Sequence, residues 1–283
     1  MSNAVDYGYN ESLEIGHSNA SVFVDKINKR LRLTGYSGDL NEIAPALAEM
    51  AQKLALGKVI IFAPQKDSAN LESSGYGCEG KITAYFRGET AYVYTLFTDP
   101  QRKQSGYQQQ EAELLNTINH SQPAARNLDL GDLQIRTAGE KDIEKLLQLY
   151  SRTFKSYPSP LMEKAYMQQI MRRNVVFICA FNGNQAVSSA SLEMDLENAN
   201  AELTDCATLS QYRGRGLLQE IMNRLEDRAR EIGLVVLYSL ARAGSYGMNA
   251  SLHKMDYNFE GKLVNNCHIG GRYENMNIWV KPL

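Results

Sequence analysis

The chain has 283 residues, with 43% hydrophobic and 22% charged side chains, and its 30 basic and 32 acidic residues leave a formal net charge of −2. This composition is typical of a globular protein that buries one or two cores, and the near-neutral charge argues against a nucleic-acid-binding protein. No apolar run approaches the roughly 18 residues that a membrane-spanning helix needs, so we expect no membrane partner.

The N-terminus has neither the basic region nor the apolar core of a signal peptide. Four cysteines lie far apart, at positions 78, 179, 206 and 267, which matches neither a disulfide framework nor a zinc site. We therefore expect a cytoplasmic protein without a metal.

The first part of the chain, residues 1–119, mixes strand-like and helix-like patterns. Pro45 lies near the first turn of its first predicted helix, which favours a later start for that helix. The predicted elements, in chain order, are one or two strands in 21–34, a helix over 40–54, a buried strand at 58–63, a hairpin formed by 81–87 and 90–97, and a Gln-rich helix over 105–119.

Residues 120–131 are small and polar and contain Pro123, which predicts a linker. After it, residues 132–283 again alternate strands and helices, and this order favours an α/β (α+β) sheet flanked by helices. The predicted elements are a strand at 133–136, a helix over 143–154, a second helix starting at Ser159-Pro160 with Glu163 in capping position, a hairpin formed by 175–181 and 186–194, a strand at 201–209, a long helix ending near Gly233, a strand at 234–240 and a helix in 245–257.

The segment that suggests a binding site is the turn between strand 201–209 and the long helix. It reads Gln211-Tyr212-Arg213-Gly214-Arg215-Gly216. Unpaired backbone N–H groups and the helix dipole favour phosphate at such a junction. A tight turn that needs glycine at positive φ is the simpler interpretation of Gly-x-Gly alone. A third glycine for a dinucleotide fingerprint and the Gly-Lys-Ser/Thr of a P-loop are both missing.

The string Gln211-x-x-Gly214-x-Gly216 after a strand resembles the acyl-coenzyme A signature of the GNAT family of N-acetyltransferases, and residues 245–257 resemble the helix that follows in that family. The resemblance covers about residues 132–283. It implies a mixed, mostly antiparallel sheet and acetyl-coenzyme A as co-substrate. The coenzyme-binding residues it implies are Cys206, Thr208, Gln211, Arg213, Gly214, Arg215, Gly216, Leu217 and Asn249.

Two positions depart from the family pattern. Asp256 replaces a usual glycine, and Leu252 stands where many relatives place a tyrosine that protonates the leaving thiolate. The adjacent His253 is a lone helical histidine, which is more often structural. This departure keeps open a non-catalytic acyl-coenzyme A sensor as the alternative to an enzyme.

A short repeated segment occurs in both parts of the chain. Residues 76–81 and 257–262 both read Tyr-x-x-Glu-Gly-Lys. We interpret residues 1–119 as a partial GNAT-like α/β domain, which lacks the coenzyme motif and so should not bind coenzyme A. Chance similarity over six residues is the alternative.

Several strings resemble the β-lysine N-acetyltransferases more closely, namely 72–76, 85–88, 156–160 and 204–208. The resemblance implies acetylation of the side-chain amine of β-lysine, giving N6-acetyl-β-lysine, a compatible solute. The alternative is a different amine, such as a polyamine, an antibiotic or a protein N-terminus. The oligomeric state stays open, a homodimer included.

A lysine-like amine has a pKa of about 10.4 and must lose a proton before it attacks a thioester. Asp205 and Glu193 are the candidate bases, directly or through water. The alternative role for each is a solvated or capping carboxylate. For Glu193 this alternative is as strong as the catalytic role. Backbone N–H groups near 206–209 are predicted to form an oxyanion hole, whereas Cys206 is expected to pack rather than to act as a nucleophile.

β-Lysine also carries a carboxylate and a second ammonium group. By family analogy, Tyr157 and Ser159 are predicted to line the acceptor pocket. An arginine suits the carboxylate because its planar fork pairs in bidentate fashion. Arg242 is our candidate, with Arg152 and Arg272 as alternatives.

Overall fold

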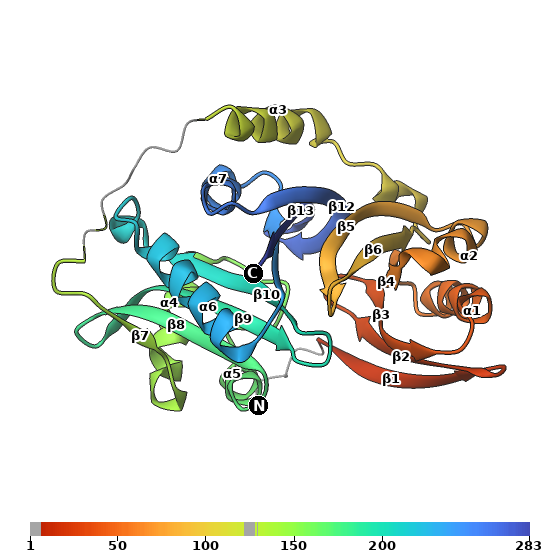
Figure 1. Ribbon diagram of the computed structural model, residues 1–283, viewed down its shortest axis with the longest axis horizontal. Coiled ribbons are helices and arrows are strands. Elements are labelled where there is room, and N and C mark those ends of the chain that lie inside the picture. The colour runs from red at the N-terminus through yellow and green to blue at the C-terminus, as the bar shows by residue number, and fades with distance from the viewer. Residues whose placement is uncertain (1–6, 122–127, 129) are drawn as a thin grey trace.

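The computed structural model describes residues 7–121, 128 and 130–283 (Figure 1). The strands are β1 (Gly8–Ile15), β2 (Ser18–Asp25), β3 (Arg30–Ser37), β4 (Lys58–Pro64), β5 (Gly77–Phe86), β6 (Glu89–Leu96), β7 (Gln134–Thr137), β8 (Val175–Asn182), β9 (Gln185–Asp195), β10 (Asn200–Thr208), β11 (Val236–Arg242), β12 (Asn258–Ile269) and β13 (Arg272–Pro282). The helices are α1 (Leu40–Lys53), α2 (Ser68–Ser73), α3 (Gln108–Asn119), α4 (Ile143–Thr153), α5 (Lys164–Met171), α6 (Leu217–Ile232) and α7 (Tyr246–Lys254).

All of these strands join one sheet in the order β1-β2-β3-β4-β6-β5-β12-β13-β11-β10-β9-β8-β7. Among the described strands only β3–β4 and β10–β11 pair in parallel. The predicted mixed, mostly antiparallel sheet with flanking helices is therefore confirmed. No helix in the described part of the chain is long and apolar enough to cross a membrane.

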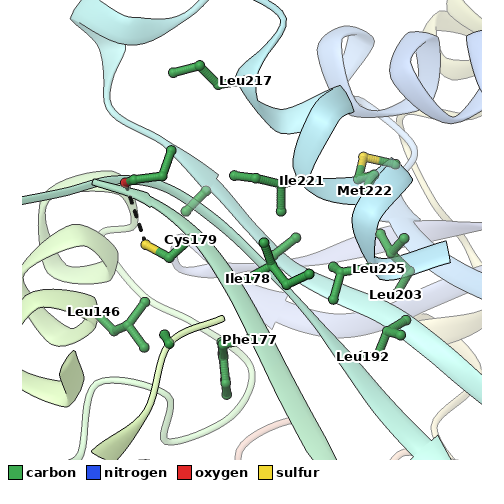
Figure 2. Packing of buried hydrophobic residues seen from close by; sticks show 14 of the residues in the cluster. Leu146, Phe177, Ile178, Cys179, Leu192, Leu203, Leu217, Ile221, Met222 and Leu225 are labelled. Atoms are coloured by element: carbon green, nitrogen blue, oxygen red, sulfur yellow. Dashed lines mark hydrogen bonds between the residues drawn. The ribbon is translucent and has the colours of Figure 1, made fainter. Parts of the chain in front are cut away.

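The core of the C-terminal half lies on both faces of strands β8 to β10. In Figure 2 the apolar side chains of α6 lie over one face, with Leu217, Ile221 and Leu225 pointing at the sheet, while Leu146 of α4 lies on the other side. The helix buries these residues because they recur at spacings of three and four, which places them on one stripe. This packing fixes the start of α6, and with it the glycine turn, relative to β10.

The strand order outward from the β5–β12 pair is equivalent in the two halves of the sheet. The two Tyr-x-x-Glu-Gly-Lys segments, residues 76–81 and 257–262, meet at this pair. Gly80 pairs with Gly261, and a Cβ on Gly261 would lie only 2.5 Å from the Gly80 Cα. Glu79 accepts a hydrogen bond from the backbone N–H of Val264 at 2.9 Å, and Glu260 accepts one from Thr83 at 2.8 Å. Each glutamate thus bonds the residue four positions after its counterpart.

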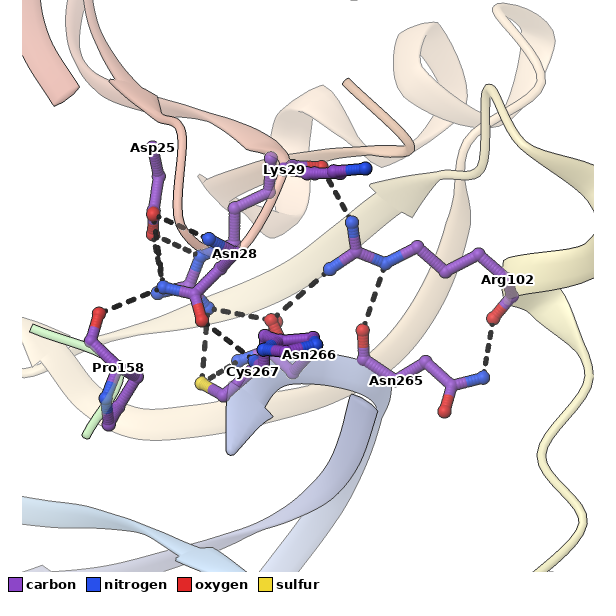
Figure 3. Close-up of polar contacts among 10 residues, drawn as sticks. Asp25, Asn28, Lys29, Arg102, Pro158, Asn265, Asn266 and Cys267 are labelled. Carbon is purple, nitrogen blue, oxygen red and sulfur yellow. Dashed lines mark hydrogen bonds and ion pairs between the residues drawn. The ribbon is translucent and has the colours of Figure 1, made fainter. Parts of the chain in front are cut away.

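A buried network of hydrogen bonds joins the two halves of the sheet (Figure 3). Arg102 donates to the carbonyls of Asn265 and Asn266, and Asn265 donates back to the Arg102 carbonyl at 2.8 Å. Arg30 bonds Asp25 at 2.8 Å and also reaches the Asn266 carbonyl. Because buried polar groups must be paired, these bonds hold the N-terminal half in a fixed position against β12.

Several predicted boundaries were wrong. Strand β1 was missed. Helix α1 runs through Pro45 rather than starting later. Helix α5 begins at Lys164, not at Ser159-Pro160, because tertiary hydrogen bonds hold residues 156 and 158 in a non-helical loop. The predicted linker, residues 120–131, falls mostly on 122–127 and 129, which lie outside the described residues.

Candidate active site

A pocket of about 260 Å³ opens where β10 and β11 separate, between the two halves of the sheet. The parallel ladder of these strands ends at the pair Glu202 and Tyr238, and the pocket lies beyond it. Both halves contribute to the walls. The polar and charged lining includes Arg30, Arg32, Tyr157, Ser159, Tyr166, Glu193, Glu202, Thr204, Asp205, Cys206 and Arg242.

Asp205 lies in a bulge of β10, at a positive φ of 52°, where the register with β9 shifts between Thr204 and Ala207. The bulge turns the carboxylate into the pocket. Tyr157 donates to its Oδ1 at 2.9 Å and Ser191 donates to its Oδ2 at 2.7 Å. Burial raises the pKa of Asp205 to about 6, although both hydrogen bonds act to lower it. The site therefore holds an oriented carboxylate that is a stronger base than an exposed one.

Two glutamates face each other across β9 and β10 beside this aspartate. Glu193 and Glu202 are direct partners in the antiparallel register, and both line the pocket. Burial, and after it the negative charge of Glu193, raises the pKa of Glu202 to about 8, although the positive charge of Arg32 acts to lower it. Glu202 was missed from sequence, although its spacing from Thr204 and Cys206 already placed it on their face of the strand.

The loop between α4 and α5 brings Tyr157 and Ser159, the two predicted wall residues, to the lining of the pocket. It is held by the N-terminal half, since Asn28 donates to the Pro158 carbonyl at 3.0 Å (Figure 3). It is also held by the turn between β12 and β13, since the Gly270 N–H donates to the Ser156 hydroxyl at 2.7 Å. These bonds fix the tyrosine that orients Asp205.

The three arginines considered for the carboxylate have different surroundings. Arg242 lines the pocket, at the end of β11. Arg272 pairs with Glu274 at 2.9 Å and is not among the lining residues. Arg152 lies in a second hollow, described below. Arg30 and Arg32, from strand β3, were not anticipated, because their approach depends on the long-range sheet order.

The second hollow, of about 190 Å³, lies at the N-terminal end of α6. It is lined by Thr208, Gln211 and Arg213 from the predicted coenzyme segment and by Arg152 from α4. Gly214 and Gly216 both have φ of 79°, and a Cβ at Gly214 would meet no atom within 4 Å. The open space at Gly214, a helix N-terminus and two arginines fit a phosphate-bearing ligand.

Other predicted coenzyme residues have internal roles in the structure. Leu217 is 1% exposed and packs in the core. Asn249 is fully buried: its Nδ2 donates to two carbonyls, and its Oδ1 accepts from Asn277 and Trp279. Its side chain therefore supports the turn before α7 and has no hydrogen-bonding capacity left for a ligand, which argues against direct binding. Arg215 lies 5.8 Å from the Tyr212 ring.

Cys206 lines the pocket, but burial raises the pKa of its thiol well above the ordinary range. A nucleophilic thiolate is therefore disfavoured, in line with the expected packing role. Leu252 is fully buried and has no proton to donate. His253 lies 6.2 Å from the Trp279 ring. Among the described residues there is no cluster of three or more histidine, cysteine or acidic side chains suited to a metal.

Comparisons with known proteins give the family. The model of the acetyltransferase (GNAT) family matches residues 143–250. N-acetyltransferase YodP of Bacillus subtilis is 34% identical over 92% of this chain and 94% of its own. Beta-lysine N(6)-acetyltransferases of Methanosarcina mazei and Methanococcus maripaludis are 32% and 30% identical, over 88% and 92% of this chain and 99% and 95% of theirs. The chain belongs to the GNAT family of acetyltransferases, and it is an enzyme of that class.

Proposed function

We propose that this acetyltransferase transfers the acetyl group of acetyl-coenzyme A to the side-chain amine of β-lysine by direct attack of that amine. The names of two relatives support this acceptor. The pocket supports it too, since three carboxyl groups and three arginines suit a molecule with two ammonium groups and one carboxylate. The observation that carries the proposal is Asp205, a buried carboxylate held by Tyr157 and Ser191 inside the pocket.

Asp205 is the proposed base. Its pKa of about 6 leaves it mostly ionised at neutral pH, so it can accept, directly or through water, the proton that the side-chain ammonium group must lose before the amine attacks. Tyr157 and Ser191 fix its two oxygens, and the pocket walls hold the amine close to the acetyl donor, which supplies further acceleration. Glu193 lies on the neighbouring strand. Its negative charge attracts the cationic acceptor.

Acetyl-coenzyme A supplies an activated acetyl thioester. The residues proposed to hold it are the turn around Gly214 and Gly216, with Arg213 and Arg152 at the hollow beside α6. Beyond Glu202 the edge of β10 that faces β11 has no ladder partner among the described strands. Its backbone is thus open to the pantetheine arm, and its N–H groups near 206–209 are the proposed oxyanion hole.

Leu252 favours a second candidate, a non-catalytic acyl-coenzyme A sensor, because the usual proton donor is missing there. A proton donor at that position is not essential, since a thiol of ordinary pKa, about 8.5, leaves readily as its thiolate. A GNAT enzyme for another amine, such as a polyamine, is the same-class alternative. We further propose that N6-acetyl-β-lysine serves as a compatible solute and that the enzyme works in the cytoplasm.

The test is an acceptor comparison. Purified protein is incubated with acetyl-coenzyme A and β-lysine, α-lysine or spermidine, and thiol release is followed together with the mass of the product. The proposal expects β-lysine to be acetylated well ahead of the other two. Preferred turnover of spermidine would point to a polyamine enzyme, and coenzyme binding without any turnover would favour the sensor.

A further inference from the structure

One arginine of the N-terminal half lines the acceptor pocket and has no hydrogen-bond or ion-pair partner among the described residues. Arg30 and Arg32 both come from β3 and both line the pocket. Arg30 is buried and engaged, since it bonds Asp25 and the Asn266 carbonyl. The Arg32 side chain is exposed and makes no hydrogen bond or ion pair with any residue that the structure describes. Its guanidinium group therefore has donors available for a ligand.

Arg32 has an acidic residue as its counterpart in the equivalent strand of the C-terminal half. The parallel ladder of β3 and β4 ends at the pair Arg32 and Ile60, and that of β10 and β11 ends at Glu202 and Tyr238. Arg32 and Glu202 therefore occupy corresponding last positions of the two ladders. Their charges are close enough to interact, since Arg32 lowers the pKa of Glu202. The far end of the pocket thus places the Arg32 cation beside the Glu202 carboxyl group.

The spacing along β10 matches the length of the acceptor. Three residues of strand separate Glu202 from Asp205, about 10 Å in a regular strand and less across a bulge. An extended β-lysine spans about 7.5 Å from its side-chain nitrogen to its carboxyl carbon, because six bonds of about 1.5 Å each advance about 1.25 Å along a zigzag chain. An acceptor whose reacting amine lies at Asp205 therefore places its carboxylate near Arg32. Arg242 lies four residues beyond Tyr238 on β11, which runs parallel to β10. It is therefore level with Asp205, where the reacting amine lies.

We propose that Arg32 binds the carboxylate of the acceptor and so restricts the enzyme to amino acids that carry a carboxylate at the end opposite the reacting amine. This inference rests on the proposed function of the pocket. The guanidinium suits the role because its planar fork pairs with both oxygens of a carboxylate. In this proposal the N-terminal half supplies the wall of the acceptor site that determines specificity.

The test compares two acceptors that differ only in the carboxyl group. β-Lysine is measured against 1,4-diaminopentane, in which a hydrogen replaces the carboxyl group, with wild-type enzyme and with Arg32→Gln. We expect Arg32→Gln to lower kcat/KM for β-lysine by about 10- to 100-fold, mainly through KM, and to leave the diamine almost unchanged. Arg32→Lys should lose less, because it keeps the charge but not the fork.

Arg228→Gln is the matched control, since Arg228 is exposed on α6 and pairs with Glu231; it should change the turnover of neither acceptor. Unaltered coenzyme affinity shows that Arg32→Gln is folded. Equal losses on both acceptors, or an unchanged ratio between them, would overturn the role of Arg32 while leaving acetyl transfer to β-lysine intact. If α-lysine proves to be the acceptor, the same comparison with 1,5-diaminopentane decides the matter. Turnover of diamines alone, or of no acceptor, would overturn both proposals.

Discussion

Asp205→Asn tests the buried carboxylate in two independent ways. Burial raises its pKa from 3.8 to about 6, so the ionised form is about 3 kcal/mol less favourable in the folded protein than in the unfolded chain. Between about pH 4 and pH 6 the folded state keeps a proton that the unfolded chain has released. The free energy of unfolding therefore falls by about 3 kcal/mol as the pH rises through that window. The asparagine variant lacks this dependence.

Thermal unfolding at pH 4.5 and pH 7.5 measures this effect. The Tm of the variant relative to wild type should be higher at pH 7.5 than at pH 4.5, by roughly 6 °C for a chain of this size. Turnover at pH 7.5 should fall by about 10²- to 10⁴-fold, as expected when a general base is lost, with coenzyme affinity unchanged. Asp227→Asn, on the exposed side of α6, should leave turnover unaltered. A Tm difference that is the same at both pH values would refute the buried, pKa-shifted carboxylate, and near-normal turnover would refute its role as base.

Three further substitutions test other parts of the account. Gly214→Asp places a carboxylate in the phosphate turn and strains a φ of 79°, so calorimetric titration should show coenzyme affinity falling by at least about tenfold; unchanged affinity would remove the coenzyme from this turn. Tyr157→Phe removes a hydrogen bond that lowers the pKa of Asp205, so the acid limb of the kcat/KM profile should move to higher pH, and a stationary limb would count against the pair. Gly261→Ala places a Cβ 2.5 Å from the facing glycine and should lower the free energy of unfolding by several kcal/mol. Gly271→Ala, where no atom lies within 4 Å, should cost only about 1 kcal/mol, and equal losses would contradict the close approach at the junction.

The sequence predicted best where structure depends on neighbours along the chain. The turn from β10 into α6 was anticipated because glycines, a preceding strand and an amphipathic helix are all local signals. Strand β1 was missed because its sequence, GYNESLEI, is mostly polar, and it is a strand only because β2 pairs with it. The start of α5 was placed too early because a distant asparagine, Asn28, holds the preceding loop.

The candidate site divides in the same way. Asp205 was selected because a charged residue between apolar neighbours in a strand suggests burial with a purpose. Its bulge and its bond to Tyr157 follow from tertiary packing and could not be read from the strand alone. Arg32 lies far from residues 132–283, and only the shared thirteen-stranded sheet brings it to the pocket. No local pattern marks that approach.

The most direct measurement is the position of the acetyl group on the product formed from β-lysine, read by tandem mass spectrometry. Both amines of this acceptor can in principle react, and they differ in distance from the carboxylate. The account predicts acetylation at N6, because a carboxylate bound at the far end of the pocket leaves the side-chain amine at Asp205. Acetylation at N3 would contradict the orientation of the acceptor, and an unmodified β-lysine would contradict its assignment.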